Sequence, residues 1–337
     1  MKSSISMKNI ARELNVSIVT VSKALNDKDG VSDELKLKIK DLADKMGYRY
    51  NMMAKSMRDG LSYNIGVIIP EHFLGDDKSY YFSVFKHLSQ IMERHQYCAI
   101  LQVLNSDDEN NVVLPKFYYD KKVDGLIVLG QVNKAYIKAL QKIEIPAVFL
   151  DFYDENTNVD SITVDNYSGA YELTNYLIKN GHVNIAFVGD IYATSSIQDR
   201  YLGVCKSLLE HGIKLREDYV ICDRDQHGKY IEFKFPKDMP TAFVCNCDGV
   251  AYNLIIKLKE MGFHIPEDFS VVGFDNDIYA TISDPQITTV EVDVEEIAGT
   301  AVKSILDKVK KENGSTTGRS TIKGRIIYRD SVKKING

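Results

Sequence analysis

Residues 16–26 read VSIVTVSKALN, and the spacing of polar and apolar side chains in this stretch decides the fold of the N-terminal region. Ser17 is a favourable helix N-cap, because its side-chain oxygen can accept a hydrogen bond from a backbone N–H of the first turn. Val21, Ala24 and Leu25 follow at helical spacing, so we assign them to a core. The stretch therefore predicts a short helix that begins after Ser17 and buries one face.

Two further short helices are expected on either side of this one. Residues 7–14 carry apolar side chains at helical spacing, and Asn15 tolerates the left-handed backbone of a tight turn. Ser32 is placed to cap a third helix that ends near Gly47. A helix, a tight turn and a capped second helix form the helix-turn-helix pattern, which places the start of the second helix in the DNA major groove. A small helical bundle shows the same pattern, so both interpretations stay open.

The net charge of −5 conceals a split along the chain. Residues 1–60 contain 12 Lys and Arg against 8 Asp and Glu, whereas the rest contains 30 against 39. A basic end on an acidic body suits a polyanionic partner for the small part only. No apolar run reaches the length of a membrane span or a signal peptide, and the five cysteines show no CxxC spacing. We therefore expect a cytoplasmic protein with reduced thiols and no membrane partner.

From residue 64 onward, short apolar strands alternate with amphipathic helices. Strands are expected at 65–69, 98–103, 125–129, 147–150, 185–188, 242–245 and 271–274, and helices at 82–94, 168–180, 200–211 and 249–261. Such alternation predicts parallel sheets covered by helices on both faces. The strands are too many for one small sheet, so we expect two lobes, with ligands bound beyond the carboxyl ends of the strands.

Several motifs occur in the same order as in a known family. Residues 16–26 match V-S-x-x-T-V-S-[RK]-x-L-N, residues 124–127 match D-G-[IL]-I, residues 181–186 match G-H-x-x-I-A, and residues 265–275 match I-P-x-D-x-S-V-V-G-F-D. On these motifs, nearly the whole chain resembles the lac/galactose repressor (LacI/GalR) family of transcription regulators.

The resemblance implies three segments. They are an all-α helix-turn-helix headpiece over 1–50, a hinge helix and linker over 51–63, and a two-lobed, periplasmic-binding-protein-like α/β effector domain over 64–337. The chain is expected to cross between the Rossmann-like lobes near 162–166, 288–293 and 322–326. Residues 333–337 carry no heptad extension, so a C-terminal coiled-coil tetramer is not expected.

By the same resemblance, a homodimer represses carbohydrate-related genes from double-stranded operator DNA under allosteric control by a sugar or sugar derivative. Two other functions stay open, a cytosolic sugar-binding sensor and a sugar-acting α/β enzyme, both without a DNA role. The chain has no glycine-rich phosphate loop, no HExxH pair and no zinc-ligand spacing, so no enzymatic activity, cofactor or metal is expected.

The resemblance also places the DNA contacts in two segments. They are Ser17, Ile18, Val19, Thr20, Ser22, Lys23 and Asn26 in the headpiece, and Asn51, Ala54, Lys55 and Met57 in the hinge. Hydroxyls can donate to phosphates, Lys23 can reach a guanine acceptor or a phosphate, and apolar groups can contact a thymine methyl. Met57 stands where the family has a leucine that enters the minor groove, and Tyr50 replaces the preceding proline. Alternatively, Met52, Met53 and Met57 only dock the headpiece.

Three charged residues match the family's ligand contacts. Asp151, Arg200 and Asp275 follow predicted strands or open a predicted helix, where a cleft is expected. A carboxylate accepts from adjacent hydroxyls and a guanidinium donates to two oxygens, which suits a polyhydroxylated ligand. The remaining candidates are Tyr80, Tyr81, Phe82, Ser196, Asn246 and Asp248.

Two departures from the family lie beside the expected ligand. Cys247 replaces the family's usual asparagine. Residues 230–235 alternate like a strand, in a segment where relatives commonly have another helix. We therefore expect an effector that is unusual for the family.

Overall fold

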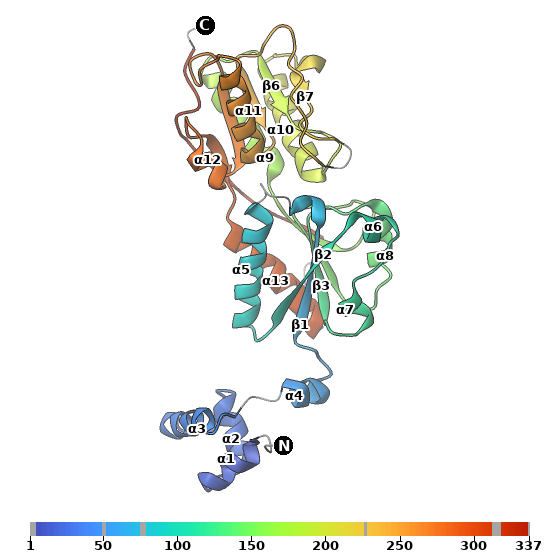
Figure 1. Ribbon diagram of the computed structural model, residues 1–337, viewed down its shortest axis with the longest axis vertical. Helices are drawn as coiled ribbons and strands as arrows, with labels where there is room; N and C mark the ends of the chain where they lie inside the picture. The colour runs from blue at the N-terminus through green and yellow to red at the C-terminus, as the bar shows by residue number, and fades with distance from the viewer. Residues whose placement is uncertain (1–4, 49–51, 75–78, 226–227, 312–317, 336–337) are drawn as a thin grey trace. The chain divides into compact units, whose positions relative to one another are not determined.

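The computed structural model describes residues 5–48, 52–74, 79–225, 228–311 and 318–335, apart from the side chains of residues 52–54 and 79 (Figure 1). The chain divides into two compact units, residues 1–61 and residues 62–337. Among the described residues, no helix is both long and apolar enough to cross a membrane.

The described residues of the N-terminal unit form α1 (Met7–Glu13), α2 (Ile18–Leu25), α3 (Asp33–Lys45) and α4 (Met52–Asp59). The Ser17 hydroxyl accepts from the backbone N–H of Thr20 at 3.0 Å, and Ser32 caps α3 in the same way. Asn15 has φ +51° and Gly47 has φ +67°. The predicted caps and turns are therefore confirmed, because each depends on local chemistry.

A small core holds α1, α2 and α3 together. It contains Ile10, Ala11, Val21, Ala24, Ile39 and Ala43, and the half-buried Leu25 packs against it. The core positions predicted on the second helix are confirmed, because the 3.6-residue period places their side chains on one face.

The described part of residues 62–337 contains two six-stranded sheets, ordered β2-β1-β3-β4-β5-β11 and β7-β6-β8-β9-β10-β12. Neighbouring strands run parallel except β10 and β12. We call the first sheet and its helices the first lobe. Its elements are β1 (Asn64–Pro70), η1 (Glu71–Phe73), α5 (Ser79–Arg94), β2 (Cys98–Leu104), α6 (Ser106–Asn110), α7 (Lys116–Tyr119), β3 (Gly125–Leu129), α8 (Lys134–Leu140), β4 (Ala147–Leu150), β5 (Asp160–Val164), α13 (Val294–Lys310) and β11 (Arg319–Ile322).

The second sheet and its helices form the second lobe. Its elements are α9 (Asn166–Lys179), β6 (Ile185–Val188), α10 (Ser195–Glu210), η2 (Glu217–Tyr219), β7 (Val220–Ile221), β8 (Ala242–Cys245), α11 (Asp248–Glu260), β9 (Ser270–Asp275), α12 (Ile278–Ile282), β10 (Thr288–Glu291) and β12 (Arg325–Ile327). Apart from residues 230–235, the predicted strands and helices from residue 64 onward are present, and central strands such as β3 and β5 are buried throughout. Burial of whole strands follows from helices on both faces of a parallel sheet.

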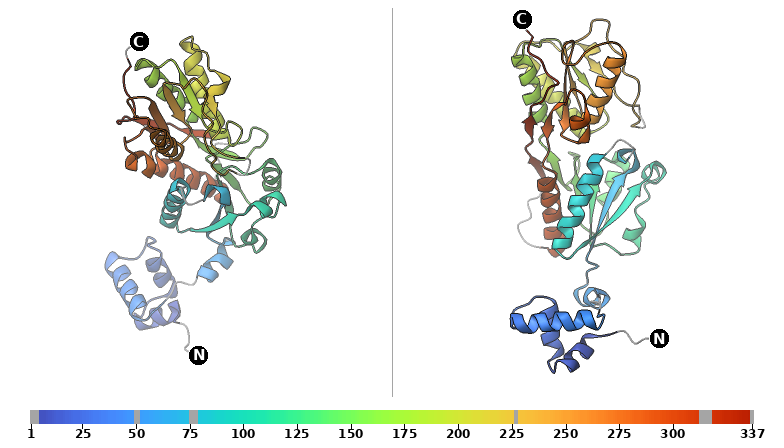
Figure 2. Two further views of the ribbon diagram at one scale, coloured as in Figure 1. Left: turned by 45° about the horizontal axis from the view of Figure 1, so that its top comes forward. Right: turned by 60° about the vertical axis from the view of Figure 1, so that its left-hand side comes forward.

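In the described residues, the chain passes between the lobes after β5, after β10 and after β11. The helix α13 follows β10 of the second sheet in sequence, yet it packs on α5 and on β3, β4 and β5 of the first. Figure 2 shows α13 beside the cyan α5 in its right-hand view. The joining segments lie together, because the backbone N–H of Asp165 donates to the backbone oxygen of Ile322, and a Cβ atom added to Gly324 would lie 2.9 Å from the backbone oxygen of Glu291.

Two sequence-based expectations about local structure are wrong. Residues 230–235 form no strand; among the described residues, only an isolated bridge joins Tyr230 to Arg224. Their alternation instead reflects an extended segment in which Phe233 and Phe235 pack on the second-lobe core. The second difference concerns Arg200, which does not open its helix. Thr194 caps α10, so Arg200 lies in the second turn.

Candidate functional site

The first turn of α2 exposes apolar side chains. Ile18 is 46% exposed and Val19 is 64% exposed, whereas Val21 and Ala24 on the opposite face are buried. Ser17 is also exposed, and the other candidate residues of this helix, Thr20, Ser22, Lys23 and Asn26, are half-buried. The first predicted DNA-facing residues therefore lie on the face of α2 opposite the headpiece core.

Polar side chains along this helix are held by local hydrogen bonds. The hydroxyls of Ser17 and Thr20 lie 2.8 Å apart, and the amide of Asn26 donates to the backbone oxygen of Ser22 at 2.7 Å. A Cβ atom added to Gly30 would lie 3.2 Å from the Lys23 ammonium nitrogen, so Lys23 reaches along the loop that follows α2. These side chains are therefore already oriented without a partner molecule.

The short helix α4 carries the other candidates. Met57 is 86% exposed, and Lys55 is half-buried. Asn51 and Tyr50, together with the side chain of Ala54, lie outside the described residues. An apolar side chain exposed to this extent on an eight-residue helix is available to contact a partner.

A cavity of about 90 Å³ lies between the lobes, beyond the carboxyl ends of strands from both sheets. Seven predicted residues line it. They are Tyr80, Tyr81, Asp151, Ser196, Arg200, Asn246 and Asp275. The walls also contain residues that were not predicted as contacts. The polar and aromatic ones are Phe73, Gln131, Thr194, Arg224, Tyr230, Cys247 and Asp277.

Arg200 is buried in the second-lobe wall, and each of its guanidinium nitrogens is bonded to the protein. Nε donates to Asn166 Oδ1 at 2.7 Å, Nη2 donates to Asp275 Oδ1 at 3.1 Å, and Nη1 donates to the backbone oxygen of Asn246. The guanidinium also lies 3.8 Å from the centroid of the Phe274 ring. Because every nitrogen is held, the guanidinium is fixed in one orientation.

Asp151 occupies the first-lobe wall with a left-handed backbone, φ +69°. A non-glycine residue in this region carries strain of about 1–3 kcal/mol, which is commonly found at binding sites. Oδ2 accepts from the Tyr81 hydroxyl at 2.9 Å, whereas Oδ1 is buried and has no hydrogen-bond partner among the described residues. Burial raises the Asp151 pKa to about 6, although Arg200 and Tyr81 act in the opposite direction.

Asp275 faces Arg200 at the end of β9 and also has a positive φ, +104°. Burial raises its pKa to about 7, although the nearby Arg200 lowers it. Burial also raises the pKa of the Cys247 thiol to about 12, so this side chain is an uncharged thiol at neutral pH. The cavity therefore combines carboxylates, guanidinium groups, aromatic rings and an uncharged thiol.

Several hydrogen bonds join the lobes at the cavity. Ser196 Oγ on α10 donates to the backbone oxygen of Asp151 at 2.8 Å. The backbone N–H of Ser195 donates to Gln131 Oε1 at 2.7 Å. A ligand in this cavity can contact both lobes at once.

Two predicted residues lie outside the cavity wall. Phe82 is 52% exposed, whereas Tyr80 and Tyr81 on the same helix face the cavity. Because successive residues of a helix are rotated by about 100°, the side chain of Phe82 points away from the cavity. Asp248 is fully buried behind the wall, where Oδ2 accepts from the backbone N–H of Asp277 at 3.0 Å. Asp248 therefore supports the loop that begins α12.

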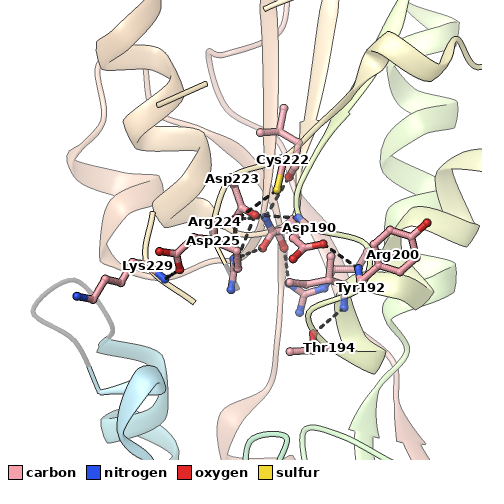
Figure 3. Close-up of polar contacts among 12 residues, drawn as sticks. Asp190, Tyr192, Thr194, Arg200, Cys222, Asp223, Arg224, Asp225 and Lys229 are labelled. Carbon is pink, nitrogen blue, oxygen red and sulfur yellow. Dashed lines mark hydrogen bonds and ion pairs between the residues drawn. The ribbon is translucent and has the colours of Figure 1, made fainter. Parts of the chain in front are cut away.

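Arg224 and Asp223 form the main part of the site that the sequence did not reveal. Figure 3 shows them beside Asp190, with dashed lines for their bonds. Both follow β7, a strand of only two residues, which was not predicted. Charged residues directly after a strand were the signal that indicated Asp151, and the same signal would have found this pair if β7 had been recognised.

Comparison with known proteins agrees with this arrangement. Residues 6–51 match the family described as bacterial regulatory proteins, lacI family, and residues 174–332 match the periplasmic binding protein-like domain. The HTH-type transcriptional regulator RegA of Clostridium acetobutylicum is 30% identical over 97% of this chain and 99% of its own length. The catabolite control protein A of Priestia megaterium is 27% identical over 96% and 98%.

Solved structures show the same fold. The lac repressor dimer bound to operator and the anti-inducer ONPF aligns with a TM-score of 0.74 at 20% identity, over 98% of this chain and 100% of that one. A complex of the transcriptional regulator CelR with cellobiose aligns with a TM-score of 0.69 at 18% identity, over 97% and 99%.

A helix-turn-helix unit followed by a two-lobed α/β unit with an interlobe cavity defines a class of DNA-binding transcription regulators. The similarity to RegA extends over nearly the whole of both chains. The chain belongs to the LacI family of bacterial regulatory proteins.

Proposed function

We propose that the protein binds a near-palindromic operator as a homodimer and that a sugar or sugar derivative in the interlobe cavity controls this binding. The proposal depends mainly on one observation, the missing hydrogen-bond donor at Asp151 Oδ1. This buried acceptor has no partner among the described residues and lies in a cavity whose other wall contains the fixed guanidinium of Arg200. A buried acceptor without a donor is costly, and a ligand hydroxyl would supply the missing hydrogen bond.

For DNA, we propose that the first turn of α2 reads base edges in the major groove. Ile18 and Val19 are exposed where this turn would meet DNA, and apolar groups recognise the thymine methyl. Ser17, Thr20 and Ser22 would donate to phosphates, and Lys23 would contact a phosphate or a guanine. The excess of Lys and Arg in residues 1–60 supports binding to a polyanion.

For the hinge, we propose that α4 lies at the minor groove and that Met57 enters it. A flexible apolar side chain can separate base steps there, and Met57 is almost fully exposed. Eight residues are too few for a stable isolated helix, so packing against DNA or a second copy would stabilise α4. This makes α4 an element whose order could change with the state of residues 62–337.

For control, the effector would act through the two lobes. A ligand shifts a conformational equilibrium only by its difference in affinity for the two states. A sugar that bonds Asp151 in the first lobe and Arg200 in the second favours the arrangement in which both contacts form. The hydrogen bonds of Ser196 and Gln131 across the cavity already join the lobes in this arrangement.

Selection from a randomised duplex library with the full-length protein tests the DNA part. We expect enrichment of one near-palindromic site, because a two-fold symmetric dimer reads two half-sites. Mobility-shift titrations of that site with and without glucose, galactose, xylose, ribose and cellobiose then test control. The proposal fails if no duplex is enriched above the starting library, or if none of these sugars changes the affinity for the enriched site.

A further inference from the structure

Arg224 is a second buried guanidinium in the wall of the cavity. Arg224 is 8% exposed, and its partner Asp223 is 1% exposed. The two charges lie 2.6 Å apart, between Arg224 Nη2 and Asp223 Oδ2. Arg224 also lies over the ring of Tyr230, 5.6 Å from its centroid, and Tyr230 begins the extended segment of residues 230–235.

Hydrogen bonds to the protein hold every polar side-chain atom of this pair except Arg224 Nη1. Asp223 accepts from the backbone N–H of Asp190 at 2.8 Å and from Asn246 Nδ2 at 2.9 Å, in addition to Arg224 Nε and Nη2 (Figure 3). Arg224 Nη2 also donates to Asn246 Oδ1 at 3.2 Å. Among the described residues, Nη1 has no protein acceptor, although the residue lines the cavity.

Stability alone does not explain such a pair. Removing two charges from water costs several kcal/mol per ion, and a well-packed apolar pair of similar volume is often at least as stable. The bonds of Asp223 orient the guanidinium instead, and leave one nitrogen for another molecule. A donor held in this way costs little reorganisation when a ligand binds.

The charges of the cavity disfavour an anionic ligand. Each guanidinium already has its own carboxylate, Arg200 with Asp275 at 3.1 Å and Arg224 with Asp223. Asp151 and Asp277 also line the cavity, and neither forms an ion pair within the described residues. An added carboxylate or phosphate would therefore meet a surplus of acidic groups in a partly desolvated space.

Two atoms indicate what a ligand can bond in this cavity. Asp151 Oδ1 is buried and has no donor among the described residues, whereas Arg224 Nη1 is accessible and can donate to an acceptor. An ammonium group supplies donors alone, and a carboxylate or phosphate supplies acceptors alone, whereas a hydroxyl supplies both. These atoms belong to opposite lobes, so one ligand that satisfies both would join the lobes.

We propose that Arg224 is the specificity-determining residue of the second lobe, and that the effector is an uncharged polyhydroxylated molecule that joins Arg224 to Asp151. This inference rests on the proposed function, because it assumes that the cavity binds an effector. It separates an uncharged sugar from a sugar acid and a sugar phosphate.

Isothermal titration of the full-length protein with matched probes tests the ligand class. The uncharged probes are glucose, galactose, xylose, ribose and cellobiose, and the anionic probes are glucuronate, galacturonate and glucose 6-phosphate. We expect at least one uncharged probe to bind, and every anionic probe to bind at least tenfold more weakly than the best uncharged probe. Tighter or equal binding of an anionic probe would overturn the proposal, as would the failure of every uncharged probe to bind.

Variants test the role of Arg224 itself. Arg224→Gln should weaken binding of the best uncharged probe at least tenfold. Because this change leaves Asp223 buried without its cation, the double variant Asp223→Asn with Arg224→Gln keeps the site uncharged and should show the same loss. Arg216→Gln is the matched control, since Arg216 pairs with Asp218 on the exposed surface of the same lobe and should leave probe affinity unchanged.

A folded double variant, shown by an unchanged circular dichroism spectrum, that binds the probe as tightly as the unsubstituted protein would overturn the inference. Duplex selection is performed on the unsubstituted protein in parallel. If that protein enriches no duplex, the proposed function fails. If it enriches a duplex and binds a sugar while the double variant binds the same sugar equally well, only the role of Arg224 fails.

Discussion

Arg319 on β11 forms an ion pair of 2.7 Å with Asp199 on α10, which links the first sheet to a helix of the second lobe. Tyr153 completes this interlobe cluster. Its hydroxyl donates to Asp199 at 2.9 Å, and its ring lies 3.5 Å beneath the Arg319 guanidinium. None of these three residues lines the cavity, so the lobes are also joined outside the ligand site.

Loss of this cluster should weaken effector binding without removing a ligand contact. Asp199→Asn removes the charge that Arg319 pairs with, and we expect a two- to tenfold loss of sugar affinity, about 0.4–1.4 kcal/mol, because the joined arrangement of the lobes becomes less stable. Calorimetric titration measures the loss. Lys206→Gln is the control, since Lys206 pairs with Glu210 on the exposed side of the same helix. An unchanged affinity in Asp199→Asn would show that the cluster does not contribute to closure.

Lys23→Ala should weaken operator binding and lower its salt dependence. If Lys23 neutralises one phosphate, the slope of log affinity against log salt should fall by about one unit, and the loss should be nearly uniform across sequences. If it contacts a guanine, the loss should instead appear at one base pair. Fluorescence anisotropy at several salt concentrations measures both effects. Lys38→Ala on α3, where Lys38 pairs with Glu34, is the control. Equal affinity and equal slope in Lys23→Ala would contradict either role.

Sugar affinity should rise with pH through about 6. Burial raises the Asp151 pKa to about 6, and a ligand hydroxyl that donates to Asp151 favours the ionised carboxylate. Binding therefore releases a proton below this pKa, so affinity falls as pH decreases from 7 to 5. Titrations between pH 5 and pH 8 measure the profile. Asp151→Asn should bind more weakly and lose this part of the pH dependence. An affinity that falls as the pH rises from 5 to 7 would exclude the ionised carboxylate as the acceptor.

Gly203→Ala should destabilise residues 62–337 by about 1–3 kcal/mol, because the close approach of α9 and α10 leaves no room for a methyl group. An added Cβ would lie 2.2 Å from the backbone oxygen of Tyr167 and 3.0 Å from the backbone nitrogen of Tyr171. Thermal unfolding should show a fall of several degrees in Tm. Gly299→Ala on α13 is the matched control, since the nearest atom, on Ile91, would lie 3.9 Å away. Equal Tm values for the two variants would contradict this packing.

The accuracy of the sequence-based predictions differed between the headpiece and the cavity for physical reasons. The cap at Ser17, the turn at Asn15 and the core position of Val21 depend on neighbours within a few residues, so they were predictable. The alternation of residues 230–235 correctly indicated an extended backbone. It could not show that the segment lacks a neighbouring strand, because pairing depends on distant parts of the chain.

By itself, the sequence determined the helices of the headpiece, the alternation of strands and helices, and the positions of Asp151 just after β4 and of Asp275 at the end of β9. Local capping and periodicity specify these features. Only the tertiary structure decided which side chains face the cavity. Asp248 is buried behind the wall while Arg224 lies in it, because the packing of α11 beneath β9 and the bonds of Asp223 set these directions, and both involve residues far apart in sequence.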